Sequence, residues 1–162
     1  MTLPMPEMIV IADTSCLIAL SRIDALSLLH QLYHRLVITE DIREEFGDPL
    51  PAWIEIMPVT DKMYQRLLEG RLDKGESSAL ALAVTLENVL LILDDLKGRK
   101  EAKRLGLRIT GTLGILFSAK QKGLIPALKP CIERLQAIDF RIAPSIVKEL
   151  LALSGEHTDS FL

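Results

Sequence analysis

Aromatic residues and cysteines are scarce in this chain of 162 residues. It has one Trp, two Tyr and four Phe, so its hydrophobic content of 49 % is mostly aliphatic. Such a composition suits a layered α/β core or a helix-rich one. The two cysteines, Cys16 and Cys131, lie far apart in apolar surroundings with no CxxC spacing. We therefore expect reduced core thiols in a cytoplasmic protein rather than a disulfide.

Zinc-ligand patterns, membrane segments and secretion signals are also missing. The three histidines, His30, His34 and His157, form no zinc-binding pattern with the cysteines. No apolar run reaches the roughly 18 residues that a membrane span needs. The opening MTLPMPEM has no basic region of the kind that begins a secretory signal. These absences predict a cytoplasmic protein without a membrane segment or a structural zinc ion.

The overall charge does not indicate a nucleic-acid-binding protein, because it is −3. One segment, 96–108, is nevertheless strongly basic and contains a single acid, Glu101. Its basic residues are Lys97, Arg99, Lys100, Lys103, Arg104 and Arg108. A local basic face can bind a polyanion even on a net acidic protein. Taken alone, the segment is more simply explained as the solvated face of a helix.

Short aliphatic runs alternate with helical segments along the chain. We predict strands at 8–13, 35–39, 53–59, 89–93 and 106–110. We predict helices at 14–23, 24–32, 40–46, 61–69, 73–88, 96–105, 111–123, 125–138 and 144–153. Asp24 is the expected cap of the second helix.

This alternation predicts an α/β fold with a central parallel sheet and helices on both of its faces. We expect one domain over residues 1–154, with its core at 8–125 and a C-terminal helical extension at 126–154. The remaining residues, 155–162, are expected to form a frayed tail.

Acidic residues directly follow two of the predicted strands. Asp13 comes after the first strand, and Asp94 and Asp95 come after the strand at 89–93. The carboxyl ends of parallel strands share one edge of the sheet, where ligands bind, so these side chains can lie close together. Glu45, late in a short helix, and Glu76, in the first turn of a long one, can join them.

Several carboxylates at one edge repel one another and raise each other's pKa values, and a divalent cation removes that conflict. Oxygen ligands with no His or Cys nearby favour Mg²⁺ or Mn²⁺. Such a centre suits phosphodiester hydrolysis. Thr14 and Ser15 could cap the first helix, hold a metal-bound water or orient Asp13, and the basic helix could bind backbone phosphates.

Each acid taken alone also has a plain structural explanation. Asp13 could only cap the first helix, and the pair Asp94 and Asp95 could only cap the basic helix. Glu45 could be a surface acid, and Glu76 could only complement a helix dipole. Their joint occurrence, at the ends of two separate strands, favours a functional site.

Four stretches together resemble the PIN-domain family, over about residues 8–125. They are IADTSCLIAL, ITEDIREEF, LDKGESSALALA and LLILDDLKGRKEAKRLGLRITGTLGIL. By position, the resemblance implies that the metal-binding and catalytic acids are Asp13, Glu45, Glu76 and Asp95, with Asp94 beside the last. Two departures from the family pattern are Thr39 in place of a usual proline and Glu rather than the commoner Asp as the third acid.

The resemblance implies a metal-dependent ribonuclease that uses Mg²⁺ or Mn²⁺ and acts on RNA, expected to be single-stranded. Such proteins are often the toxin of a toxin–antitoxin pair, so a small antitoxin is an expected partner. The aliphatic richness also favours a homodimer. The residues expected to bind the nucleic acid are Lys97, Arg99, Lys100, Lys103 and Arg104.

Two other functions remain as alternatives. The same fold could be a catalytically inactive module that binds RNA or a protein. A phosphotransfer domain is disfavoured, because Ser15 stands where a haloacid-dehalogenase-type phosphatase needs a second Asp. A response-regulator receiver would place its acid pair near the first strand, whereas Asp94 and Asp95 follow a late one.

Overall fold

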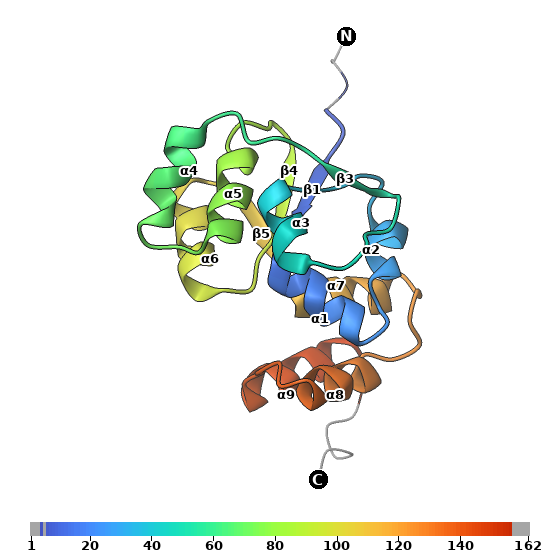
Figure 1. Cartoon of the computed structure of the whole chain (residues 1–162). Helices are drawn as coiled ribbons and strands as arrows, with labels where there is room; N and C mark the ends of the chain where they lie inside the picture. Colours follow the sequence, from blue (N-terminus) through green and yellow to red (C-terminus); the bar gives the residue numbers. More distant parts are fainter. Residues whose placement is uncertain (1–3, 5, 157–162) are drawn as a thin grey trace.

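The computed structural model of the chain describes Pro4 and residues 6–156. Its strands form a single parallel sheet with the order β3-β2-β1-β4-β5 (Figure 1). The strands are β1 (Ile9–Ala12), β2 (Leu36–Ile38), β3 (Ile54–Ile56), β4 (Val89–Ile92) and β5 (Arg108–Thr110). The predicted α/β fold with a central parallel sheet is confirmed.

Helices surround this sheet, and the last two lie away from it, at the lower end of the view in Figure 1. The helices are α1 (Thr14–Arg22), α2 (Ser27–Leu32), α3 (Glu40–Phe46), α4 (Lys62–Glu69), α5 (Lys74–Ala83), α6 (Leu96–Arg104), α7 (Thr112–Gln121), α8 (Lys129–Ala137) and α9 (Pro144–Leu153). In the part of the chain that the structure describes, no helix is long and apolar enough to cross a membrane.

The central strand β1 and its neighbour β2 are buried on both faces. Residues 10–12 of β1 and 36–38 of β2 are almost fully inaccessible to solvent. Because successive side chains of a strand point to opposite faces, burial of three in a row means that both faces are covered. This explains why the strands are continuous aliphatic runs rather than alternating ones.

The order in which the chain adds strands to the sheet reverses between β1 and β4. From β1 it proceeds outward through β2 and β3, and it then returns to place β4 on the other side of β1. Ile11 of β1 accordingly pairs with Val37 of β2 and with Leu91 of β4. In open parallel sheets, such a reversal leaves a crevice at the carboxyl ends of the two strands. Asp13 and Asp94 follow β1 and β4 at this point.

In the described part of the chain, five helices end with one hydrogen-bond pattern, in which an N–H donates to the carbonyl five residues earlier, after a residue of positive φ. In these five helix ends, the residue of positive φ is Asp24, Gly106, Gly123, Asp139 or Gly155. Asp24 (φ 57°) therefore ends α1, with the N–H of Ala25 donating to the carbonyl of Leu20 at 2.8 Å. The prediction that Asp24 caps the second helix is wrong, and α2 begins at Ser27.

The C-terminal boundaries also differ from the prediction. The helix predicted at 73–88 ends at Ala83, and α8 begins at Lys129 rather than 125. Residue 156 does not belong to a frayed tail, because the Glu156 carboxylate accepts hydrogen bonds from the N–H groups of Leu128 (2.8 Å) and Lys129 (3.0 Å). Glu156 thus holds the start of α8. The rest of the predicted tail, 157–162, lies outside the described residues.

Candidate functional site

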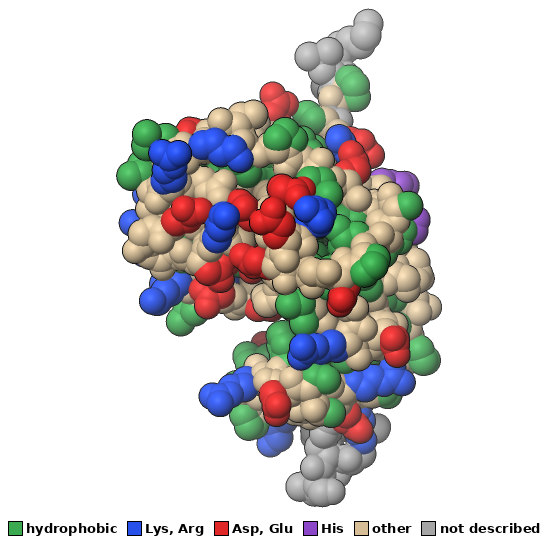
Figure 2. Space-filling view, viewed as in Figure 1, with side chains coloured by type: hydrophobic (Ala, Val, Ile, Leu, Met, Phe, Trp, Pro, Cys, Tyr) green, Lys and Arg blue, Asp and Glu red, His purple; other side chains and the backbone are tan. Residues whose placement is uncertain are grey.

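A pocket of about 490 Å³ lies at the crevice between the carboxyl ends of β1 and β4. Six acids line it: Asp13, Glu45, Asp73, Glu76, Asp94 and Asp95. The structure thus brings together all five acids that the sequence singles out, together with Thr14 and Ser15. In Figure 2, acidic side chains gather on the main body of the molecule, above a notch that separates it from α8 and α9.

Asp13 is the most buried acid of the pocket, with 4 % of its surface exposed. Its backbone N–H donates to the carbonyl of Ile92 at 3.0 Å, which extends the pairing of β1 with β4 by one residue. Among the described residues, its Oδ1 atom has no hydrogen-bond partner. Burial, helped by the negative charges of Asp73 and Glu45, raises the pKa of Asp13 to about 7. A bound cation would offset the cost of burying this carboxylate.

Glu45 reaches the pocket from α3 and is held by a residue of α1. The hydroxyl of Thr14 donates to Oε2 of Glu45 at 2.7 Å. Gly75 makes room for this carboxylate, because a Cβ atom at that position would lie 2.5 Å from the same oxygen. The predicted capping of α1 is wrong, because no side chain makes a cap hydrogen bond there. Thr14 orients Glu45 instead, and Ser15 is an exposed residue of the pocket wall.

Asp73 and Glu76 come from the start of α5. Asp73 is the N-cap of that helix, and its Oδ1 accepts from the N–H of Glu76 at 2.8 Å. Glu76 is 7 % exposed, and its pKa is raised by burial, by its hydrogen bond with Asp73 and by that neighbour's charge. Our sequence analysis missed Asp73. The spacing of an Asp three residues before a Glu, typical of a helix start, could have located it.

Asp94 and Asp95 accept hydrogen bonds from two different helices. Asp94 accepts two hydrogen bonds from Thr112 at the start of α7, from its N–H (2.9 Å) and from its hydroxyl (2.6 Å). A Cβ atom at Gly111 would lie 2.6 Å from Oδ1 of Asp94, so the glycine permits this approach. Asp95 is the N-cap of α6 and accepts from the N–H of Gly98 at 3.2 Å. Both residues line the pocket.

The donor set of the pocket fits a hard divalent cation. All six acids offer oxygen, neither His nor Cys lines the pocket, and Oδ1 of Asp13 is buried without a partner. Over residue 4 and residues 6–156, however, no three acidic, His or Cys side chains stand arranged around one point as metal ligands. Four of the six carboxylates instead accept hydrogen bonds from protein donors.

A comparison of the sequence with known protein families is consistent with the fold described above. The DUF3368 family, described as a PIN domain, matches residues 9–156. The chain belongs to the PIN-domain family. This match covers more than the stretch 8–125 that carries the resemblance in sequence, because it includes α8 and α9. The PIN fold is of a nuclease type. A search of curated proteins found none that matches the chain.

The basic helix α6 of this PIN domain begins at the acidic pocket, but none of its cations is among the described residues that line the pocket. Arg99 donates to the carbonyl of Leu93 at 2.8 Å, and Arg104 forms an ion pair with Glu101. Two of the five predicted nucleic-acid-binding residues are therefore bound to protein groups. Lys97 and Lys100 line a separate pocket of about 580 Å³, together with Arg104, and Lys103 is exposed.

The cation that does line the acidic pocket is Arg141, from the loop between α8 and α9. Phe140 lines the pocket beside it. Our sequence analysis missed both residues. No local signal points to them, because they lie 45 and 46 residues after Asp95 and follow no strand of the sheet.

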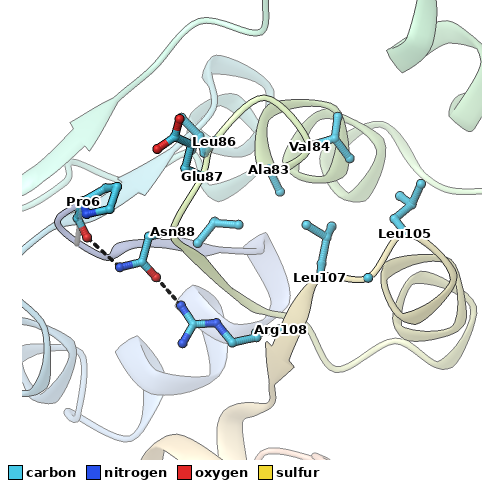
Figure 3. Close-up of a pocket in the computed structure, with 11 residues that line it drawn as sticks. Pro6, Ala83, Val84, Leu86, Glu87, Asn88, Leu105, Leu107 and Arg108 are labelled. Carbon is cyan, nitrogen blue, oxygen red and sulfur yellow. Dashed lines mark hydrogen bonds between the residues drawn. The ribbon is translucent and has the colours of Figure 1, made fainter. Parts of the chain in front are cut away.

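A further pocket of about 600 Å³ lies at the opposite edge of the sheet, before β4 and β5 begin. Figure 3 shows Asn88 there, donating to the carbonyl of Pro6 at 2.7 Å and accepting from Arg108. The wall is otherwise largely aliphatic, and Glu87 is the single acid among the described residues that form it. This pocket lacks the carboxylate cluster, so the candidate metal chemistry belongs to the carboxyl-end pocket.

Proposed function

We propose that this PIN domain is a metal-dependent ribonuclease that hydrolyses RNA phosphodiester bonds with Mg²⁺ or Mn²⁺. The observation that carries the proposal is Asp13, a buried carboxylate with an unpartnered oxygen in a pocket that five other acids line. Concentrating so many carboxylates in one pocket is unfavourable for folding alone. A divalent cation would compensate for it.

In this proposal Asp13, Glu45, Glu76, Asp94 and Asp95 hold the metal. When bound, the ion polarises a phosphoryl oxygen and lowers the pKa of an attacking water. Hydrogen bonds within the protein hold four of the pocket carboxylates in place. Thr14 orients Glu45, Thr112 fixes Asp94, and the two N-cap residues Asp73 and Asp95 are tied to their own helices.

The proposal extends to the biological setting that the family suggests. We infer that the substrate is single-stranded RNA and that the protein acts in the cytoplasm as the toxin of a toxin–antitoxin pair. Its partners would be a small antitoxin and a second copy of the chain. The support for these points is membership of the PIN-domain family, whose fold is of a nuclease type.

Cleavage of a labelled single-stranded RNA in Mn²⁺ tests the enzymatic part. Asp13→Asn and Asp95→Asn are expected to abolish metal-stimulated cleavage while circular dichroism shows an intact fold. Asp48→Asn is the matched control, because Asp48 is an exposed acid outside the pocket. Absence of metal-stimulated cleavage of any RNA or DNA by the wild type would rule the enzyme out.

A second candidate is a PIN module that binds RNA or a protein without cleaving it. The observation that favours it is that four of the six pocket carboxylates accept hydrogen bonds from protein donors, and that the described residues form no ready ligand set. Calorimetric titration with Mn²⁺ separates the two functions. A lack of binding at millimolar Mn²⁺, together with retained RNA binding, would favour the module.

A further inference from the structure

The loop between α8 and α9, residues 138–143, has a defined conformation. Asp139 has a positive φ of 64°, and the N–H of Phe140 donates to the carbonyl of Leu135 at 2.9 Å. This is the hydrogen-bonded helix end described above. On the other side of the loop, Ala143 precedes α9, which starts at Pro144. The backbone at both ends of the loop is therefore defined by a helix end, and Phe140 and Arg141 lie between these ends at the pocket.

This loop contributes Phe140 and the positively charged Arg141 to the wall of the acidic pocket. Arg141 is exposed, and within the described part of the chain its guanidinium forms neither an ion pair nor a hydrogen bond. It stands by a pocket of six acids without being bound to any of them. Phe140 is half-buried, packs against the hydrophobic core with part of its surface, and also borders the pocket. An aromatic ring and an unpaired cation thus face the candidate metal centre.

We propose that Phe140 and Arg141 bind the nucleic-acid strand next to the bond that is cleaved. Arg141 contacts a backbone phosphate, and Phe140 stacks on an unpaired base. This inference rests on the proposed function, because it names how the same site holds its substrate. A guanidinium matches the geometry of a phosphate, and aromatic rings stack on bases with little dependence on sequence.

The proposed contact selects for a single strand. Bases within a duplex are already stacked on each other, so a protein ring has access to a base only where the strand is unpaired. The cationic residues Lys97 and Lys100 of α6 lie in their own pocket, and Figure 1 places α6 and the α8–α9 pair in different parts of the molecule, with the start of α1 between them. A nucleic-acid strand that crosses the acidic pocket could therefore contact the lysines of α6 on one side of the pocket and Arg141 on the other.

Fluorescence anisotropy with a labelled single-stranded oligoribonucleotide tests the inference. The titration is done in Ca²⁺, with a gel to verify that the RNA stays intact, and repeated with the duplex of the same sequence. Arg141→Ala is expected to raise Kd at least fivefold and to lower the slope of log K against log salt by about 0.7, the value for one phosphate contact. Arg134→Ala, an exposed arginine of α8 outside the pocket, is the matched control and should change neither.

Phe140→Leu keeps an apolar side chain against the core but removes the ring. It is expected to raise Kd for the single strand severalfold, to leave the salt slope unchanged, and to leave duplex binding unaffected. Equal values of Kd and slope for Arg141→Ala and Arg134→Ala would overturn the proposal. An equal effect of Phe140→Leu on single strand and duplex would overturn the stacking contact.

Cleavage kinetics in Mn²⁺ distinguish this inference from the proposed nuclease function. If the wild type cleaves RNA, Arg141→Ala should raise KM with little change in kcat, because a binding contact has been lost. Unchanged KM and kcat would overturn the inference and leave the nuclease intact. If the wild type binds RNA through Arg141 but never cleaves it, the binding contact stands and the nuclease function fails.

Discussion

The hydroxyl of Thr14 donates a 2.7 Å hydrogen bond to Oε2 of Glu45, across 31 residues of sequence. This bond joins the start of α1, directly after the sheet, to the end of α3. Thr14 lies two residues after the end of β1, so this contact orients Glu45 of α3 relative to that strand. The orientation of Glu45 thus depends on a residue that binds no metal in our proposal.

Thr14→Val should weaken metal binding more than it weakens the fold. The change removes a hydrogen bond to a carboxylate that solvent can still reach, so we expect a loss of about 1 kcal/mol in the free energy of unfolding. The freed Glu45 should lower Mn²⁺ affinity severalfold by calorimetry. Thr14→Ser keeps the hydroxyl and should retain that affinity. Equal Mn²⁺ affinity of the Val and Ser variants would contradict this role.

The stability of the metal-free protein should fall as pH rises from 5 to 7. Burial raises the pKa of Asp13 from 3.8 to about 7, so over this range the folded state holds a proton that the unfolded state has lost. One pKa unit corresponds to about 1.4 kcal/mol, so the contribution of Asp13 decreases by about 4 kcal/mol at most.

Urea unfolding in EDTA at a series of pH values from 5 to 8 measures this dependence. Asp13→Asn should flatten the curve and should be more stable than the wild type at pH 8. Part of the slope should persist in the variant, because the pKa of Glu76 is also raised. The opposite dependence of Glu101, whose pKa is lowered by Arg104, is confined to more acidic solutions. Identical pH slopes for the wild type and Asp13→Asn would show that Asp13 titrates normally.

Mn²⁺ should stabilise the protein more at pH 8 than at pH 6. A metal needs the deprotonated carboxylate, and at pH 6 most Asp13 side chains carry a proton if their pKa is about 7. The stabilisation follows RT ln(1 + [metal]/Kd), so a tenfold weaker apparent affinity lowers it by about 1.4 kcal/mol. Thermal unfolding with and without Mn²⁺ at the two pH values provides the measurement. Equal shifts at both pH values would argue against a metal on Asp13.

Gly75→Ala should impair the site while leaving the fold intact. The new Cβ atom would lie 2.5 Å from Oε2 of Glu45, so this flexible side chain must move away from Thr14. Because Ala favours helices over Gly by about 1 kcal/mol, we expect stability to change by no more than about that amount. Mn²⁺ affinity should fall by about tenfold. Gly70→Ala is the control, because its Cβ would approach only the carbonyl of Leu67, at 3.3 Å.

The lysines of α6 should contribute more to RNA affinity than Arg104 does. In the described structure Lys97 and Lys100 are exposed and make no ion pair, whereas Arg104 is bound to Glu101. The double change Lys97→Ala and Lys100→Ala should weaken RNA binding and lower the salt slope by about 1.4, the value for two phosphate contacts. Lys122→Ala, at an exposed lysine directly after α7, is a suitable control.

Arg104→Ala should instead act mainly on stability. It removes one of two arginines that contact the buried Glu101, which is 8 % exposed, and leaves Arg71 at 2.9 Å as the partner. We expect a loss of about 1 kcal/mol in the free energy of unfolding and no change in the salt slope. A salt slope reduced as strongly as in the double lysine variant would assign Arg104 to the nucleic acid as well.

The sheet and the acids at its edge could be predicted because their signals are local. Strands β1, β2 and β4 are short aliphatic runs that are mostly buried, and Asp13 and Asp94 come directly after two of these runs. Parallel pairing then determines that both side chains reach the same edge, however far apart they lie in sequence. The prediction needed no knowledge of side-chain contacts.

The contacts that position the acids could not be predicted in this way. Thr14 looks like a helix cap in sequence, and only the packing of α1 against α3 reveals its bond to Glu45. Arg99 and Arg104 look like free cations, and only the fold reveals their partners Leu93 and Glu101. These contacts depend on how helices pack, which short sequence patterns do not encode.

Three pocket acids also hold the protein together, and this has a consequence for comparing sequences. Asp73 and Asp95 start helices α5 and α6, and Asp94 ties β4 to α7 through Thr112. A family member without catalytic activity would still be selected to keep them. The side chain of Asp13 makes no such cap and is unfavourably buried, so folding alone would favour its replacement. Among relatives of this chain, persistence of Asp13 is therefore the more informative sign of a working site.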